Sequence, residues 1–360
     1  MISAPALDAA VNVSGISSLV SELSTALAGK ISYQYIRLGK PQLGGRVRRL
    51  LASLISILRA IGALISSRAS IFHSNTAFDV NSIYRDSVLI SIAKAARKRV
   101  VLHVHGGYYV HEPASGLVRK LLARLLKSAD RVVFLSNTEK KKFESRYPEY
   151  ASKMCAIYNS LNLDDIDRFG AGAHEGEHLE VAFVGRFVDT KGLKIVLEAA
   201  RAEYPCKVHF FVHGDGPLRG IVDQAVKENP SLTKAQIFSH DRWREVLCRY
   251  DVLLLPSVSG EGMPMVVLEG MALGVVPITT AIASIPEVVK DGTRGILVPC
   301  NDLAAVVHAI SDLAKNRVKL GQMRDACRVY ARDNFDVRVG SARLLEIYRS
   351  LEQDQDLNKQ

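Results

Sequence analysis

Cysteine is scarce in this sequence, and no two cysteines stand at a recognisable paired spacing. The five cysteines of the 360-residue chain are Cys155, Cys206, Cys248, Cys300 and Cys327. No C-x-x-C spacing occurs among them, so neither a zinc site nor a disulfide framework is indicated. We therefore expect the chain to work in the reducing cytoplasm.

Long hydrophobic runs are also lacking. The sequence does not open with a basic segment followed by an apolar stretch, which is the pattern of a signal peptide. No window reaches the roughly 18 apolar residues that a membrane-spanning helix needs. We expect neither secretion nor a transmembrane anchor, so any contact with the inner face of a membrane is expected to be peripheral.

Aromatic residues are few, and charge is divided unevenly along the chain. Aromatic side chains make up 7% of the residues, with a single tryptophan. Few side chains are therefore present on which nucleic-acid bases could stack, and a nucleic-acid partner is not expected. Residues 1–170 contain 24 Lys and Arg against 12 Asp and Glu, whereas residues 171–360 contain 23 against 25. The basic first half favours an anionic partner, and an ordinary basic surface that serves solubility is the alternative.

The pattern of apolar runs predicts two α/β domains with parallel sheets. Short buried strands alternate with stretches of helical period, which is typical of a doubly wound, Rossmann-like fold. The expected strands are 70–73, 100–104 and 131–135, and then 181–184, 208–212, 252–255 and 275–279. The segment Phe169–His178 has the composition of a linker, so we expect one domain over 1–168 and a second from residue 169.

Two cations follow the expected strand that ends at Val184. Arg186 and Lys191 stand between Gly185 and Gly192, and ligands of doubly wound sheets bind outside the carboxyl ends of the strands. A guanidinium chelates two phosphate oxygens, and an ammonium acts as a movable point charge. The pair is therefore interpreted as a clamp for a diphosphate, with two solvated surface cations as the alternative.

Two carboxylates surround the start of a later helix. The apolar stretch Met265–Leu273 predicts a helix preceded by Pro264, and its free N–H groups and positive dipole end can hold a phosphate. Glu261 lies in the loop before this helix and Glu269 lies within it, where carboxylates can bind sugar hydroxyls. A structural salt bridge of Glu269 is the alternative, because a buried charge needs a partner.

Two histidines of the expected strand 100–104 and its end project to one face. His103 and His105 are two positions apart, and alternate residues of a strand share a face. A zinc site with His111 is not expected, because no further ligand completes a set of suitable spacing. We favour a His105 that hydrogen-bonds a sugar or transfers a proton, with core packing as the alternative.

Several motifs in a fixed order carry a resemblance to a known class. They are 185–192 (GRFVDTKG), 213–218 (HGDGPL) and 261–269 (EGMPMVVLE), with weaker signals at 105–107 (HGG) and 158–161 (YNSL). Together they resemble the retaining glycosyltransferases of the GT-B fold, the large "group 1" or family 4 class, in which two Rossmann-like domains face each other across a cleft. The spacing E-x7-E is typical of that class.

The resemblance implies a metal-independent enzyme whose second domain, 169–335, binds a nucleoside-diphosphate sugar. Arg186 and Lys191 would hold the diphosphate, and Glu269 would bind the ribose hydroxyls. No cofactor is implied beyond the UDP- or GDP-linked sugar itself. The segment 239–241 (SHD) departs from the Gly-containing turn usual in the class, so the base stays open.

The resemblance also assigns residues around the transferred sugar. Glu261 would contact the sugar together with backbone N–H groups of Met263 and Pro264, and His105 would approach from the first domain. In relatives a glycine pair after the first strand touches the donor phosphates, and here the single Gly15 would keep that role. A final helix, within 336–360, would return to pack on the first domain.

The basic first half bears on the acceptor. The segment 46–65 is helical in pattern, apolar and basic at its start, so it could lie in a membrane interface or pack on the first sheet. We expect a lipid-linked or glycan acceptor and an anionic membrane surface as partner. The rival readings are a GT-B nucleotide-sugar epimerase and a non-enzymatic binder of anionic surfaces.

Overall fold

The chain folds into two compact units, each built on one sheet. The computed structural model describes residues 1–4, 15–38, 46–169, 178–234, 240–259 and 261–357. Unit 1 comprises residues 1–160 and 337–360, and unit 2 comprises residues 161–336. Both sheets have six strands, and every neighbouring pair is parallel. The expected fold class is thereby confirmed.

The sheet of unit 1 has the strand order β2-β1-β3-β4-β5-β6. Its strands are β1 (Ile2–Ala4), β2 (Tyr35–Arg37), β3 (Ile71–Thr76), β4 (Arg99–Val104), β5 (Arg131–Phe134) and β6 (Met154–Ala156). All six residues of β3 are buried. Strands covered on both faces read as continuous apolar runs rather than alternating ones, which is why the central strands could be predicted.

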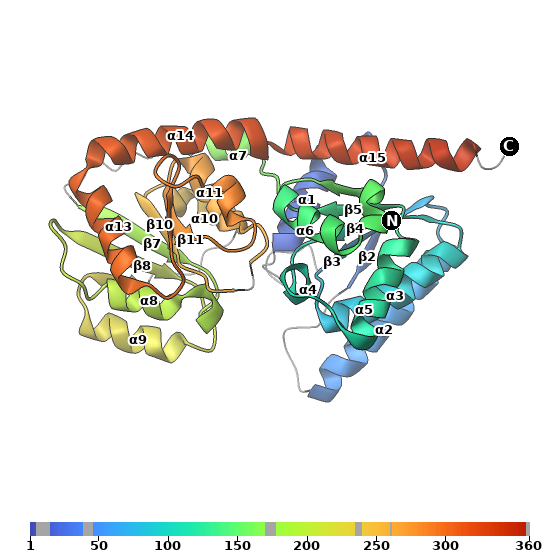
Figure 1. Ribbon diagram of the computed structural model, residues 1–360, viewed down its shortest axis with the longest axis horizontal. Coiled ribbons are helices and arrows are strands. Elements are labelled where there is room, and N and C mark those ends of the chain that lie inside the picture. The colour runs from blue at the N-terminus through green and yellow to red at the C-terminus, as the bar shows by residue number, and fades with distance from the viewer. Residues whose placement is uncertain (5–14, 39–45, 170–177, 235–239, 260, 358–360) are drawn as a thin grey trace. The chain divides into compact units, whose positions relative to one another are not determined.

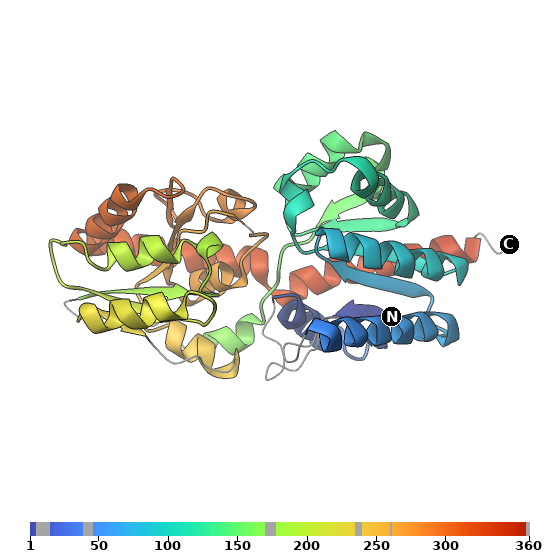
Figure 2. The same cartoon turned by 90° about the horizontal axis from the view of Figure 1, so that it is seen from below.

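Helices cover both faces of this sheet (Figures 1 and 2). On one face α2 (Arg46–Ser66), α3 (Val80–Ala95) and α5 (Gly116–Ser128) lie side by side and bury one hydrophobic core. On the other face α1 (Gly15–Ala26) packs with α15 (Val337–Leu357) in a second core. The shorter elements are α4 (Tyr108–His111), α6 (Asn137–Arg146) and the 3-10 helix η1 (Pro148–Lys153).

Unit 2 has the strand order β12-β11-β10-β7-β8-β9. Its strands are β7 (Leu179–Val184), β8 (Val208–His213), β9 (Leu232–Lys234), β10 (Val252–Leu255), β11 (Val276–Thr280) and β12 (Ile296–Val298). Its helices are α7 (Leu163–Asp167), the 3-10 helix η2 (Asp189–Lys191), α8 (Leu193–Ala199), α9 (Arg219–Glu228), α10 (His240–Leu247), α11 (Met265–Leu273), α12 (Ile285–Val288), α13 (Leu303–Lys315) and α14 (Arg317–Phe335). Figure 1 shows α14 and α11 together, and α11 packs against both α14 and α10.

The seven expected strands all exist, and five others were missed. The strand predicted at 252–255 matches β10, and the one at 70–73 extends in fact to Thr76. The missed strands have three residues each: β1, β2, β6, β9 and β12. Three residues are too few to show a period, so only the tertiary structure defines them as strands.

Local sequence explains where several helices begin. The Ser136 hydroxyl accepts a hydrogen bond from the Glu139 N–H at 3.0 Å and caps α6. The Asp302 carboxylate does the same for the Ala305 N–H at 2.9 Å and caps α13. Such caps satisfy N–H groups that have no partner within the helix.

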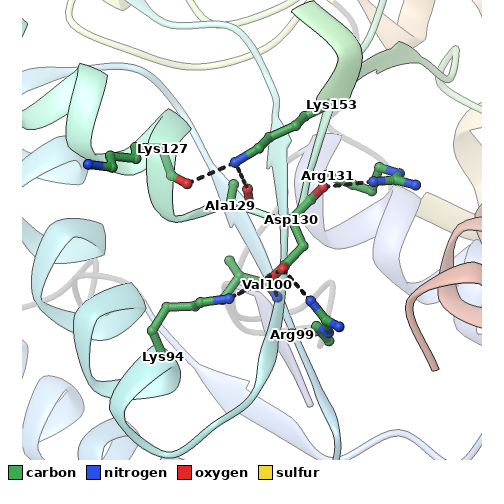
Figure 3. A network of polar contacts seen from close by, with 8 residues as sticks. All are labelled: Lys94, Arg99, Val100, Lys127, Ala129, Asp130, Arg131 and Lys153. Carbon is green, nitrogen blue, oxygen red and sulfur yellow. Dashed lines mark hydrogen bonds and ion pairs between the residues drawn. The ribbon is translucent and has the colours of Figure 1, made fainter. Parts of the chain in front are cut away.

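Asp130 joins the amino ends of two central strands of unit 1 (Figure 3). Its carboxylate accepts a hydrogen bond from the Val100 N–H at 2.7 Å, and it pairs with Lys94 at 2.9 Å and with Arg99 at 3.0 Å. Burial alone would raise the pKa of Asp130, but these donors and cations outweigh it and hold the pKa below its usual value. The carboxylate therefore stabilises the β4–β5 pair in its ionised form.

Candidate functional site

The candidate site of unit 2 lies where the strand order reverses. Strand β7 has β8 on one side and β10 on the other. Ligands of doubly wound sheets bind at this switch point, outside the carboxyl ends of the strands. The loops after β7 and β10 meet there, because the Val258 N–H donates to the Thr190 carbonyl at 2.9 Å.

A cation and a carboxylate pair with each other between these two loops. Lys191 Nζ donates to Glu261 Oε1 at 2.6 Å, and the Ser257 hydroxyl donates to the same oxygen at 2.5 Å. Glu261 is buried, whereas Lys191 is half-buried. Two of the residues expected from sequence are thus brought together, and the alternative of two solvated cations is wrong for Lys191.

Two glycines let the surrounding backbone approach closely. Gly192 has φ of 68°, and a Cβ built on it would lie 2.0 Å from the Pro256 carbonyl oxygen. At Gly214 a Cβ would lie 1.9 Å from the Gly185 carbonyl oxygen. No side chain fits at either place, so these glycines set the close packing of the loops after β7, β8 and β10.

Helix α11 begins directly after Pro264 and ends at Leu273 with Gly274 as its C-cap, as the positions of the proline and the glycine predicted. Met263 is buried, and Pro264 caps the helix without a side-chain hydrogen bond. The expected N–H donor at Pro264 was wrong, because proline has no backbone N–H. The Val267 N–H donates to the Pro264 carbonyl at 3.0 Å, so among the described residues the N–H groups that this helix end can offer a ligand are those of Met265 and Val266.

Glu269 forms the salt bridge that was the alternative from sequence, with a partner that the sequence did not reveal. Its carboxylate oxygen lies 3.4 Å from Arg244 Nε of α10, and both side chains are buried. A buried carboxylate needs such a partner, so the salt bridge considered for Glu269 exists. The pair holds the carboxylate in place on α11.

The remaining donor-binding candidates differ in how much the structure describes of them. Arg186 is exposed, and its side chain has no ion pair or hydrogen bond within the described ranges. Gly15 is the first residue of α1, but the loop before it lies outside the described residues. Ser239 of the departing motif also lies outside them.

Three histidines adjoin one another on one face of the unit 1 sheet. The rings of His103 and His105 have centroids 4.3 Å apart, as their shared face predicted. His73 Nε2 lies 3.2 Å from His103 Nδ1, and His73 Nδ1 lies 2.5 Å from the Tyr348 hydroxyl. His105 Nε2 lies 2.7 Å from Asn75 Oδ1.

The histidines of this cluster are neutral. Burial, together with the neighbouring His103 and His73, holds the pKa of His105 well below its usual range, and burial lowers the pKa of His103 to about 3. Within the described part of the chain, no group of three or more His, Cys, Asp or Glu residues is arranged to hold a metal ion. The rings hydrogen-bond to one another and to neighbours instead of converging on one point.

Three residues of the site were missed by sequence reasoning. Ser257 stands only four positions before Glu261, so its place in the same loop was the available signal. Asn75 was hidden because the predicted strand ended at His73, three residues before the end of β3 at Thr76. For Arg244 no signal exists, since a contact 25 positions apart between two helices leaves no periodicity.

Two family models match the chain in succession. "Glycosyltransferase Family 4" matches residues 14–165, and "Glycosyl transferases group 1" matches residues 178–316. One curated relative is the GDP-mannose-dependent alpha-(1-6)-phosphatidylinositol monomannoside mannosyltransferase of Mycolicibacterium smegmatis, which is 27% identical over 279 residues and 71% of each chain. The alignments span about half the length, 37% to 56%, of four other curated relatives.

Solved structures match the fold over nearly the whole chain. HepE of Anabaena, in complex with UDP and glucose, has a TM-score of 0.72 at 16% identity and covers 97% of this chain and 98% of its own. Sucrose-phosphate synthase of Thermosynechococcus elongatus has a TM-score of 0.77 at 18% identity and covers 98% of both chains. With its two parallel six-stranded sheets of the GT-B type and both family models matched in order, the chain belongs to the group 1, family 4 glycosyltransferases.

Proposed function

We propose that the protein transfers a sugar from a nucleoside-diphosphate sugar to an acceptor, with retention of the anomeric configuration. The observation that carries the proposal is the meeting of Lys191 and Glu261 at the β7–β10 switch point, beside the start of α11. A cation, a carboxylate and a helix N-terminus are what a donor's diphosphate and sugar hydroxyls require. Their combination on one sheet edge supports binding of both halves of such a donor.

The proposed chemistry is electrostatic. Breaking the bond between the anomeric carbon and oxygen builds negative charge on the departing diphosphate, and preorganised positive groups stabilise that charge. Arg186, Lys191 and the α11 N–H groups are the positive groups of this chain that would stabilise the diphosphate. We therefore propose a reaction that does not depend on a divalent metal. Lys191 pairs with Glu261, and the diphosphate would compete for the same ammonium group.

The other roles follow from position. Glu269, already held by Arg244, would accept the ribose hydroxyls, and Glu261, held by Ser257, would accept hydroxyls of the transferred sugar near Met263. Gly15 would let the start of α1 approach the phosphates, and His105 would contact the sugar from unit 1. HepE was solved with UDP and the mannosyltransferase relative uses GDP-mannose, and we propose one of these two bases.

Nucleotide binding can be tested by thermal shift. A panel of UDP, GDP and ADP is measured in the presence of a chelator, where a ligand at about 100 times its dissociation constant adds roughly 2.7 kcal/mol. One nucleotide should raise the midpoint of wild type, and Lys191→Ala should abolish the effect. Lys194→Ala is the control, since Lys194 lies nearby but, within the described ranges, pairs only with the exposed Asp189. Equal shifts in both variants, or none in wild type, would refute the proposed site.

For the acceptor we propose a lipid-linked or glycan precursor at an anionic membrane. The described residues contain no helix that is both long and apolar enough to cross a membrane. The contact that we propose is a peripheral one. Two helices expose rows of apolar side chains to solvent. These are Leu51, Leu54, Ile55, Leu58 and Ile65 on α2, and Val80, Tyr84 and Val88 on α3. Apolar rows beside basic side chains favour an interface of anionic lipid.

The basic side chains lie on the neighbouring helix. Lys120, Arg124 and Lys127 are exposed on α5, and neither α5 nor α2 contains an Asp or Glu. Each such cation near an anionic surface contributes about 1 kcal/mol. The three helices lie side by side on one face of the sheet (Figure 2), and we propose that their exposed apolar and basic side chains meet the membrane together.

Vesicle sedimentation tests this partner. The protein should bind vesicles that contain phosphatidylglycerol, release at high salt, and bind pure phosphatidylcholine weakly. The double variant Leu54→Glu with Leu58→Glu should lose binding, whereas Val318→Glu with Val329→Glu, at equally exposed positions of unit 2, should retain it. The proposed membrane surface would be overturned if wild type does not bind anionic vesicles, or if the Leu54 and Leu58 variant binds them as wild type does. Neither result bears on the donor site.

A further inference from the structure

A chain of hydrogen bonds crosses three neighbouring strands of unit 1 and ends on His105. The Asn75 side-chain N–H donates to the Ser3 carbonyl of β1 at 2.8 Å, and the Asn75 backbone N–H donates to the Ser3 hydroxyl at 3.0 Å. Asn75 Oδ1 lies 2.7 Å from His105 Nε2. Ser3 and Asn75 are both buried, so water does not compete for these bonds.

The Ser3 carbonyl determines which way the Asn75 amide points. A carbonyl oxygen can only accept, so the NH₂ of Asn75 must face it and Oδ1 must face the histidine. A flipped amide would place two oxygens against each other in a buried site. Since Oδ1 can only accept, the hydrogen bond requires that His105 Nε2 carries the proton.

The second nitrogen of the ring is then an acceptor. His105 is neutral, because burial and the neighbouring His103 and His73 hold its pKa well below the usual range. In a neutral ring with Nε2 protonated, Nδ1 carries a lone pair and no hydrogen. Among the described residues no group hydrogen-bonds to this nitrogen, and the half-buried His105 stands just past the carboxyl end of β4.

We propose that Asn75 is a positioning residue that holds His105 as the neutral Nε2–H tautomer and so makes Nδ1 an acceptor for a ligand hydroxyl. A sugar hydroxyl can donate to such a nitrogen, whereas an ionised phosphate oxygen has no hydrogen to offer. Asn75 thereby selects for the sugar part of a donor and against its diphosphate at this place. The tautomer stands on the geometry of unit 1 alone, and only its use on a sugar rests on the proposed function.

The titratable groups around the cluster support a neutral ring. Those that face it are His103 of β4, His73 of β3, Tyr348 of α15 and the amino group of Met1. No carboxylate hydrogen-bonds to any of the three histidines among the described residues. Introducing a carboxylate at position 75 is therefore a direct test, because it places a negative charge beside His105 and favours the protonated ring.

The tautomer can be read without any substrate. In protein labelled with ¹⁵N-histidine, two-bond ¹H–¹⁵N correlation spectra distinguish the Nε2–H, Nδ1–H and protonated rings, and a His105→Asn variant assigns the signal. Wild type should show His105 as the neutral Nε2–H form at pH 7. Asn75→Asp should raise the pKa of His105 by roughly one to three pH units, and Ser74→Ala, on the opposite face of β3, should leave it unchanged.

A wild-type His105 that is protonated or in the Nδ1–H form would overturn the proposal, and so would an unchanged pKa in Asn75→Asp. In the pH profile of kcat/KM, the acidic limb of Asn75→Asp should move to higher pH by the same amount as the pKa of His105 in the spectra. The value of kcat/KM should return to that of wild type at high pH. A loss that is equal at all pH values would mean a structural role only. If no nucleotide shifts the melting of wild type, the proposed function fails, while the spectra still decide the tautomer.

Discussion

Replacing Gly192 with alanine is expected to lower the free energy of unfolding of unit 2 by about 2–5 kcal/mol. A left-handed backbone costs a residue with a Cβ about 1–2 kcal/mol, and Gly192 has φ of 68°. The added methyl would also lie 2.0 Å from the Pro256 carbonyl oxygen, and relieving such an overlap by moving backbone costs about 1–3 kcal/mol more.

Gly292 provides a matched control in the same unit. Its φ is 72°, but a Cβ there meets no atom within 4 Å, so Gly292→Ala should cost only the conformational part, about 1–2 kcal/mol. The difference between the two variants in chemical denaturation isolates the overlap. Equal losses in both would refute the reasoning that the loops after β7 and β10 are closely packed at this point.

The same substitution should weaken nucleotide binding. Moving Pro256 away from Gly192 separates the loop that carries Lys191 from the loop that carries Glu261, which now bond at 2.6 Å. The nucleotide-induced thermal shift should therefore shrink in Gly192→Ala and persist in Gly292→Ala. A full shift in Gly192→Ala would show that the spacing of the loops does not govern the site.

Two further predictions concern buried and partly buried charges. Asp251→Ala should cost about 3–5 kcal/mol in denaturant unfolding, because it removes the carboxylate that the buried Arg324 meets at 2.9 Å; Asp325→Ala, at an ion pair whose carboxylate is exposed, should cost less than about 1 kcal/mol. Asp130→Asn should lower stability at pH 7 by about 1–3 kcal/mol and flatten its fall in acid. Since the folded-state pKa of Asp130 lies below the unfolded value, its contribution is present above about pH 4 and is lost as the pH falls through the folded pKa. An acid transition unchanged in Asp130→Asn would contradict this.

The central strands could be predicted because burial on both faces leaves an apolar run in the sequence. The run at 252–255 became β10 without change. The prediction for β3 ended early because its last residues, Ser74, Asn75 and Thr76, are polar although they are buried. Polar residues inside a sheet are accounted for by hydrogen bonds to other strands, and those partners cannot be read from local pattern.

The site was predictable where one loop or one helix carries it. The start of α11 could be predicted because Pro264 precedes a continuous apolar stretch, and Glu261 lies in the loop just before it. The pairing of Lys191 with Glu261 spans 70 positions, and that of Arg244 with Glu269 joins two helices. Such contacts are set by the order of strands in the sheet and by helix packing, which a single sequence does not encode in any period.

The division of unit 1 into two stretches of chain has a consequence for biosynthesis. Its sheet forms from residues near the start of the chain, but Leu344, Tyr348 and Leu351 of α15 belong to the core on one face of that sheet. On the ribosome, unit 2 is contiguous and can complete its core first, whereas unit 1 must wait for α15 to be synthesised. During translation the α1 face of the first sheet therefore lacks α15 while the whole of unit 2 emerges, so apolar residues of this core stay exposed to water until α15 follows.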